Sequence, residues 1–296
     1  MRTIRIGTRG SALALAQTES VRQALQSAVP QIETEVVTIR TAGDILADAP
    51  LDAIGGKGVF VKDIERRLLQ DRIDMAVHSL KDMQAALPEG LVIGAYLERE
   101  DPRDMLFSAG DYSLGTLPQG CRIGTSSMRR RCQIREARPD LEVVNIRGNV
   151  TTRLNKVGSS VDAVILAAAG VMRLGLPVGV AIDTGTMIPS PGQGIIAVEC
   201  RETDREILEM LDALDHAPTR ACAEAERAFL ATLGQDCTLP AGALAEVSGG
   251  EIYMAGMLGS TDEATCVRMS LRGPSPTVGS TLARKLQEHM HRGSVS

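Results

Sequence analysis

Aromatic residues are scarce in this sequence of 296 residues, which contains three Phe, three Tyr and no Trp. Proteins that bind single-stranded nucleic acid stack the bases on aromatic side chains, so the shortage argues against that function. The formal net charge of −5 argues against a general nucleic-acid surface as well. We therefore expect an aliphatic core, with the twelve methionines as flexible filler.

Long apolar segments are also missing. The longest run, Ala163 to Met172, is too short to span a bilayer. Ala12-Leu13-Ala14 mimics a signal-peptide cleavage site, but no apolar region of sufficient length accompanies it. The six cysteines form no CxxC pair and no zinc-ligand spacing. These absences predict a cytoplasmic protein with reduced thiols, no membrane association and no metal site.

One stretch of the chain concentrates positive charge. Residues 121–153 contain eight arginines against three acids, although the chain as a whole is acidic. Thr125-Ser126-Ser127 and Arg147-Gly148-Asn149 each follow a predicted strand end and precede a predicted helix. Helix starts offer free N–H groups, and arginine forks match carboxylate or phosphate geometry. We interpret the stretch as an anion site, with a solvated helix face as the alternative. Phosphate, nucleotide and carboxylate ligands are all open at this point.

The two halves of the chain share a pattern. Arg5-Ile6-Gly7-Thr8 recurs as Arg122-Ile123-Gly124-Thr125, and Asp74-Met75-Ala76-Val77 resembles Asp162-Ala163-Val164-Ile165. The order strand, helix, strand, helix, strand in each half predicts a duplicated α/β lobe with a mostly parallel sheet. Ligands bind such pairs of lobes at the carboxyl ends of the strands. We therefore expect the polar residues at these strand ends to face one cleft.

Turn-forming segments suggest where the domains divide. The segment 188–194 is rich in Pro and Gly and predicts a crossover, after which Ile195 to Glu199 returns to the first lobe as a strand. Glycine-rich turns after Gly234 and an alternating strand near Glu251 to Leu258 predict a small α+β domain. The glycine-rich segment 41–58 is a candidate lid. The expected domains are 1–98 with 195–214, then 99–190, then 217–296.

Two individual residues are candidates for a chemical role. Asp82 follows Lys81 directly after a buried strand; a surface ion pair is the alternative interpretation. Beside Lys81 and Arg9 its carboxylate would stay ionised, and could stabilise a developing cation or carry a proton. Cys237 is the one cysteine in a turn-rich loop at a domain border, where an incidental thiol is the alternative.

Eight segments carry a resemblance to a known family. In chain order they are RIGTRGSALAL, GGKGVFVKDIE, DMAVHSLKDM, REDPRD, IGTSSMRRRCQ, IRGNVTTRL, PGQG and the loop around Cys237. Together they resemble the porphobilinogen deaminases, or hydroxymethylbilane synthases, over nearly the whole chain. The resemblance implies two lobes like those of periplasmic binding proteins, a small α+β third domain and a monomer. It also implies a dipyrromethane cofactor held by a thioether to Cys237.

The implied activity is that of a transferase in tetrapyrrole and heme biosynthesis. Four porphobilinogen molecules are condensed head to tail on the dipyrromethane with release of ammonia, and the chain is then hydrolysed to hydroxymethylbilane. A non-enzymatic two-lobed polycarboxylate binder or sensor is the alternative, but it accounts for neither Cys237 nor the third domain. At Gln235 and Asp236 the sequence departs from the family's Gly-Gly, and an acid beside Cys237 disfavours its thiolate.

The resemblance also implies roles for individual residues. Asp82 would stabilise the cationic azafulvene that deamination leaves. Lys57 and Phe60 would belong to the lid, and Arg131 is interpreted as a surface residue. Each pyrrole ring carries an acetate and a propionate, which bidentate arginines suit. The residues implied to hold cofactor and substrate carboxylates are Arg9, Ser11, Lys81, Thr125, Ser126, Ser127, Arg129, Arg130, Arg147, Arg153 and Gln193.

Overall fold

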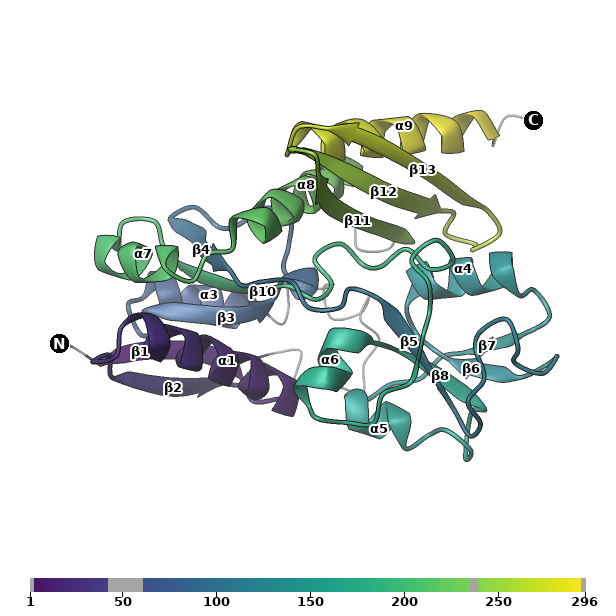
Figure 1. Cartoon of the computed structure of the whole chain (residues 1–296), viewed down its shortest axis with the longest axis horizontal. Helices are drawn as coiled ribbons and strands as arrows, with labels where there is room; N and C mark the ends of the chain where they lie inside the picture. Colours follow the sequence, from purple (N-terminus) through teal and green to yellow (C-terminus); the bar gives the residue numbers. More distant parts are fainter. Residues whose placement is uncertain (1–2, 42–60, 235–238, 294–296) are drawn as a thin grey trace. The chain divides into compact units, whose positions relative to one another are not determined.

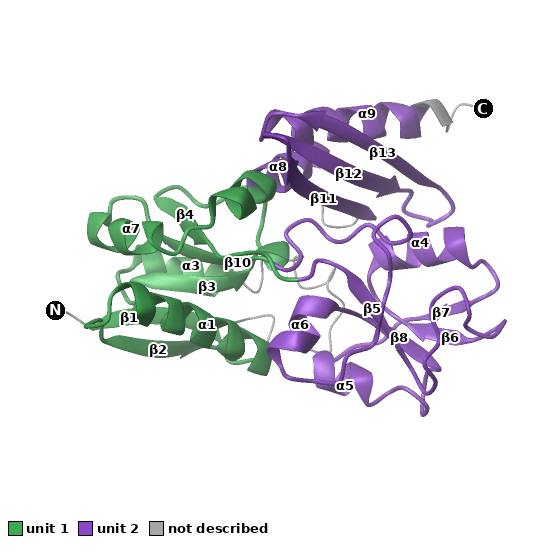
Figure 2. Cartoon of the chain, viewed as in Figure 1, with its two compact units in different colours: residues 1–100, 195–223 green, residues 101–194, 224–296 purple. Residues whose placement is uncertain are grey.

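The computed structural model describes residues 3–41, 61–234 and 239–293, with side chains up to residue 291. The chain divides into two compact units (Figure 2): residues 1–100 with 195–223, and residues 101–194 with 224–296. The second unit contains both the predicted second lobe and the C-terminal part. The division into three domains therefore stays a prediction.

The first unit is built on a five-stranded sheet with the order β2-β1-β3-β10-β4 (Figure 1). β1 pairs in parallel with β2 and β3, whereas β10 runs antiparallel to both β3 and β4. The strand that follows the predicted crossover thus returns to this sheet, as expected. The strands are β1 (Ile4–Arg9), β2 (Thr34–Ile39), β3 (Met75–Ser79), β4 (Leu91–Tyr96) and β10 (Ile196–Arg201).

Helices bury the apolar side chains of this sheet. Ile6 of β1 and Val198 of β10 pack in one cluster with residues of two helices, α1 and α7. Ile39 of β2 packs in another cluster with the apolar side of α3, which includes Ile64 and Leu68. Apolar residues three and four positions apart give each helix the stripe that this packing needs. The helical segments are α1 (Ala12–Ala28), α3 (Lys62–Leu69), the 3-10 turn η3 (Leu80–Asp82) and α7 (Arg205–Asp212).

The second unit contains a five-stranded sheet of the same design, with the order β7-β6-β8-β5-β9. β6 occupies the place of β1 and pairs in parallel with β7 and β8, while β5 is the antiparallel strand. The duplication predicted from the recurring Arg-Ile-Gly-Thr is therefore confirmed. The elements are β5 (Asp104–Ser108), β6 (Arg122–Gly124), α4 (Met128–Ala137), β7 (Glu142–Val144), α5 (Val150–Leu154), β8 (Ala163–Ala167), α6 (Ala168–Arg173) and β9 (Val180–Ala181).

The C-terminal part adds an antiparallel sheet, β11-β12-β13, to the second unit. Helix α9 lies against β12 and β13 (Figure 1), which confirms the expected α+β character. A Cβ on Gly279 would come within 1.9 Å of the Ala225 carbonyl oxygen, so glycine is needed where α8 and α9 touch. The elements are α8 (Ala217–Leu233), β11 (Ala241–Ser248), β12 (Glu251–Gly259), β13 (Cys266–Gly273) and α9 (Thr277–Gly293).

Candidate active site

The carboxyl ends of β1 and β3 bring three of the predicted residues of the first unit to one cavity. Arg9 ends β1, and Ser11 caps α1 by accepting a hydrogen bond from the Ala14 N–H at 3.3 Å. Because β1 and β3 are adjacent and parallel, their ends meet at one edge of the sheet. Arg9, Ser11 and Asp82 line a cavity of about 60 Å³ at this edge.

Asp82 is held by a short, well-fixed turn. Leu80 is buried, and its N–H donates to the carbonyl of Ile195, the residue before β10. The Met83 N–H donates back to the Leu80 carbonyl and closes the 3-10 turn. The turn places Asp82 on the cavity, with Lys81 beside it in the sequence. The carboxylate thus sits on rigid backbone at the edge of the sheet.

Buried polar groups lie under this cavity, and the sequence analysis missed them. His78 lines the cavity and lies 3.0 Å from Glu199 of β10, measured between Nε2 and Oε2. Burial raises the pKa of Glu65 on α3 to about 7; the charge of Glu199 adds to the effect and that of His78 opposes it. A glutamate on the apolar face of α3, and another within the apolar run of β10, were the signals that could have revealed these groups.

Gln17 and Ser79 form a partly buried pair at the cavity. The Gln17 amide nitrogen donates to the Ser79 hydroxyl at 2.7 Å, and that hydroxyl donates to the amide oxygen at 3.0 Å. Both residues line the cavity, so α1 is fixed against the end of β3 at the place where Asp82 emerges. A partly buried hydrogen-bonded pair of this kind stabilises one arrangement of the two elements.

In the second unit the predicted hydroxyl residues fix the start of α4. The Ser127 side chain caps the helix, accepting from the Arg130 N–H at 3.5 Å. Ser126 donates its hydroxyl to the Ile146 carbonyl at 2.6 Å, and Thr125 accepts from the Ser127 N–H at 3.2 Å. The three hydroxyls therefore shape the turn between β6 and α4, and their contact with a ligand stays a prediction.

Arg129 and Arg130 converge on one buried acid, Asp104 of β5. Each guanidinium lies 2.7 Å from a different carboxylate oxygen. Gln193 donates to the same carboxylate at 2.9 Å and to the Pro102 carbonyl at 2.8 Å. Burial by itself raises the pKa of Asp104, but the two guanidinium charges outweigh it and hold that pKa below its usual range. Gln193 thus positions the acid that orients both arginines; its direct contact with a ligand stays a prediction.

Two further arginines of the stretch, Arg147 and Arg153, lie at the turn before α5 and on α5 itself. Arg147 is exposed, and Arg153 donates from Nε to the Gly148 carbonyl at 2.8 Å. Asn149 caps α5 by accepting from the Thr152 N–H at 2.8 Å. These contacts fix the backbone from which Arg147 projects.

The sequence analysis interpreted Arg131 as a surface residue, but the structure shows it largely buried. Its side chain is 16% exposed and pairs with Glu263 of the C-terminal part at 2.5 Å. Three further residues, Lys57, Phe60 and Cys237, lie outside the described residues, so their predicted roles in the lid and in cofactor attachment are untested.

Comparison with protein families decides the relationship. The model described as "Porphobilinogen deaminase, dipyromethane cofactor binding domain" matches residues 4–209, and "Porphobilinogen deaminase, C-terminal domain" matches residues 220–288. The chain belongs to the porphobilinogen deaminase family. The family resemblance seen in the sequence is therefore confirmed, and residues 4–209 are the family's dipyrromethane-binding part. As a member the chain is a transferase of tetrapyrrole biosynthesis.

Individual relatives agree with the family assignment. The porphobilinogen deaminase of Syntrophus aciditrophicus (strain SB) is 47% identical over 289 residues, covering 96% of this chain and 94% of the relative. That of Roseiflexus sp. (strain RS-1) is 48% identical over 280 residues, covering 94% and 92%. Among solved structures, an ancestral cationic amino acid solute binding protein covers 72% of this chain and 88% of its own, with 14% identity and a TM-score of 0.42.

The charges of the second unit fit the cofactor of the family. A dipyrromethane bears acetate and propionate groups, and Arg129 and Arg130 together exceed the single charge of Asp104. Within the described part of the chain, the Arg130 Nε is buried and has no hydrogen-bond partner. An additional carboxylate would satisfy this excess of buried positive charge.

Within residues 3–41, 61–234 and 239–293, no three His, Cys, Asp or Glu side chains gather as a metal site would require. None of the helices in these ranges combines the length and the apolar character needed to cross a bilayer.

Proposed function

We propose that this chain condenses four porphobilinogen molecules head to tail, releasing ammonia at each step, and hydrolyses the product to hydroxymethylbilane. Family membership supports the reaction, since the matching relatives are named porphobilinogen deaminase. The two-lobed polycarboxylate binder is the less favoured alternative. That the enzyme acts as a cytoplasmic monomer remains part of the proposal.

The cavity at the ends of β1 and β3 is the observation that carries the proposed mechanism. It places the Asp82 carboxylate with Arg9 and Ser11 on rigid elements. Loss of ammonia leaves a positive charge on the substrate pyrrole, and a fixed carboxylate stabilises that charge as it develops. We assign this role to Asp82, with Arg9, Ser11 and Lys81 holding carboxylates of the substrate or cofactor.

The second unit supplies further carboxylate-binding groups. The buried pair Arg129 and Arg130 offers excess positive charge, and the exposed Arg147 projects from a fixed turn. Arg153 and the hydroxyls of Thr125, Ser126 and Ser127 are assigned to the same task. When bound, the dipyrromethane supplies the pyrrole carbon to which the first substrate is joined, with Cys237 as its point of attachment.

An intact-mass measurement tests the function. The purified wild-type chain should carry an adduct of about two pyrrole units, and the Cys237→Ser variant should lack it. The wild type should also release ammonia from porphobilinogen. A wild-type chain that is folded, unmodified and inactive would contradict the proposal and favour the binding protein.

Asp82→Asn tests the assigned catalytic residue. We expect the rate of ammonia release to fall on the order of 100- to 1000-fold, because a neutral amide cannot stabilise the developing cation. The adduct mass and the unfolding transition should stay unchanged. Asp212→Asn, at an exposed position on α7, serves as the control. Near-normal ammonia release by the Asp82 variant would remove this residue from the mechanism.

A further inference from the structure

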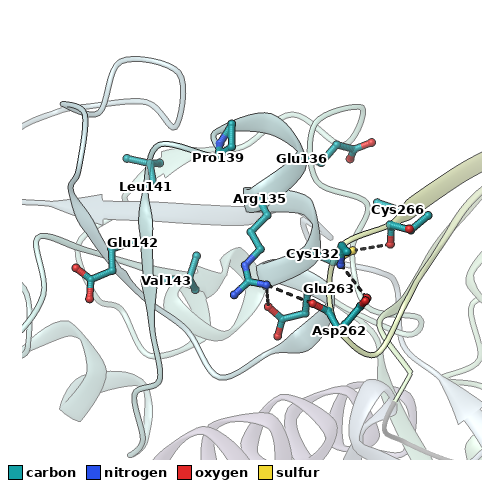
Figure 3. A pocket seen from close by; sticks show the side chains of 12 residues that line it. Cys132, Arg135, Glu136, Pro139, Leu141, Glu142, Val143, Asp262, Glu263 and Cys266 are labelled. Carbon is teal, nitrogen blue, oxygen red and sulfur yellow. Dashed lines mark hydrogen bonds and ion pairs between the residues drawn. The ribbon is translucent and has the colours of Figure 1, made fainter.

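A pair of cysteines lies where α4 meets the C-terminal sheet within the second unit. Cys132 of α4 and Cys266, the first residue of β13, line one pocket of about 750 Å³ (Figure 3). Cys132 is 1% exposed and packs with Ile188 and Met257, and Cys266 packs partly buried against this cluster. The active-site assignments above use neither thiol.

Two independent contacts place the sulfur of Cys132 beside Cys266. Its Sγ donates a hydrogen bond to the carbonyl of Thr265, the preceding residue, at 3.3 Å. A Cβ on Gly259 would lie 2.6 Å from the same sulfur, and Gly259 is the register partner of Cys266. Partner Cα atoms in antiparallel strands are about 4.5–5.5 Å apart. The Cys132 sulfur therefore lies over the strand pair that carries Cys266.

Ion pairs hold α4 against β13 and the loop that precedes it. Glu263, in the loop before β13, pairs with Arg131 at 2.5 Å and with Arg135 at 2.9 Å. Arg268 of β13 pairs with Glu136 of α4 at 2.7 Å. Figure 3 shows Arg135 directed at Glu263 beside the two cysteines. Because α4 is anchored on both sides of Cys132, the two thiols are kept close together.

The two thiols also differ in acidity. A hydrogen bond from Cys266 lowers the pKa of Cys132, and the same contact raises the pKa of Cys266. Cys132 is thus the more acidic of the two thiols and the better candidate for the attacking sulfur. Cys200 is different, since burial raises the pKa of its thiol to about 12.

We propose that Cys132 and Cys266 form a reversible oxidation site. Hydroperoxides oxidise the two thiols to a disulfide, and dithiols reduce that disulfide. The Cys132 thiolate attacks one peroxide oxygen, the O–O bond breaks, and the departing oxygen leaves as water after taking up a proton. The Cys132 sulfenic acid that results is attacked by the Cys266 sulfur. The S–O bond breaks, and a second water leaves with the Cys266 proton. Two thiols and one hydrogen peroxide thus give one disulfide and two waters.

The bond would tie α4 to β13. Such a cross-link closes a long loop and restricts the unfolded chain, so the oxidised protein should be the more stable form. We expect its midpoint of thermal unfolding to rise by about 5 °C over that of the reduced protein.

The test treats the full-length, cofactor-loaded protein with hydrogen peroxide at low molar excess. The intact mass should fall by about 2 Da, the mass of the two hydrogen atoms lost on disulfide formation. A non-reducing peptide map should join the peptides of Cys132 and Cys266, and dithiothreitol should reverse both changes. Cys266→Ser should abolish the mass loss and the thermal shift. Cys200→Ser, which removes a buried thiol of the first unit, should retain both.

Three results would overturn the proposal. One is a folded wild type whose mass does not change under peroxide. Another is a gain of about 16 or 32 Da on one cysteine without a cross-link, which indicates simple over-oxidation. The third is a disulfide that joins other cysteines and persists in Cys266→Ser. Cys266 is only partly buried, so we expect Cys266→Ser to fold. It can therefore test the proposal even if a Cys132→Ser variant does not fold.

Discussion

The carboxylate of Asp104 accepts hydrogen bonds from Arg129, Arg130 and Gln193, three residues that the sequence had assigned to ligand binding. The orientation of both guanidinium groups therefore depends on a residue that the sequence analysis did not single out. An arginine-rich stretch can be recognised from composition. The acid that folds between its side chains cannot, because it comes from a strand 25 residues from Arg129.

Replacing this acid should destabilise the fold. We expect Asp104→Asn to lower the free energy of unfolding by about 3–5 kcal/mol, since two buried guanidinium groups lose their counter-charge. The pKa of Asp104 is depressed in the folded state, so its contribution is complete above the unfolded pKa of about 3.9 and is lost as pH falls. Urea titrations at pH 7 and at about pH 2 measure this, with the exposed Asp212→Asn as control. Equal stability of both variants would contradict the expectation.

Glu65 should give the opposite pH dependence. Its pKa is raised to about 7 by burial, so the folded state binds a proton that the unfolded state releases near pH 4.5. Stability is therefore full at low pH and declines as pH rises from about 4.5 to 7. Between pH 5 and pH 8 the wild type should lose on the order of 2 kcal/mol that Glu65→Gln retains. Unfolding at three pH values tests this. The exposed Glu209→Gln should show the same dependence of stability on pH as the wild type. If Glu65→Gln shows that dependence too, Glu65 is not its source.

Among the elements, the turn between β7 and α5 requires a glycine. Gly148 has φ +111°, and a Cβ there would lie 2.5 Å from the Thr152 Cγ2. Gly148→Ala should cost about 2–3 kcal/mol of unfolding free energy and weaken the carboxylate binding that we assign to Arg147. Gly158→Ala is the matched control, because it has φ +76° and open space. It should cost only about 1 kcal/mol. If both variants lose the same stability, the Thr152 contact has no effect.

The recurring Arg-Ile-Gly-Thr correctly predicted a duplicated lobe, since β1 and β6 have equivalent neighbours in their sheets. The strands β4 and β5 were missed, because pairing with a distant strand leaves no local signal. Arg131 was misread for a similar reason: its partner Glu263 is 132 residues away. Strand ends carrying Arg9, Ser11 and Asp82 were predictable, whereas the buried His78 and Glu199 needed the fold.

At the scale of the whole molecule, the sheet of the first unit is completed by β10, a strand that follows the second unit's sheet in the sequence. β3 and β4 are joined only through β10, which belongs to residues 195–223 of the first unit. A fragment of residues 1–100 therefore lacks a strand in the interior of its sheet. In such a fragment β3 and β4 each expose an edge that β10 pairs with in the whole chain.

This topology predicts which fragments fold. Residues 1–100 alone should show no cooperative urea transition by circular dichroism. Residues 1–100 joined to 195–216 through a flexible Gly-Ser linker should fold cooperatively, because β10 and α7 are restored. A linker followed by the same segment in scrambled order is the control. Cooperative folding of residues 1–100 alone would show that β10 is dispensable.

The position of β10 also sets an order of events during translation. The strands β5 to β9 are contiguous in the chain, so their sheet is complete as soon as β9 has emerged from the ribosome. β1 to β4 emerge first but wait for another hundred or so residues, roughly 5–20 s at ordinary rates of synthesis. The earliest-made part of the enzyme is therefore among the last to close its sheet, and it is the part that a nascent-chain chaperone would need to shield.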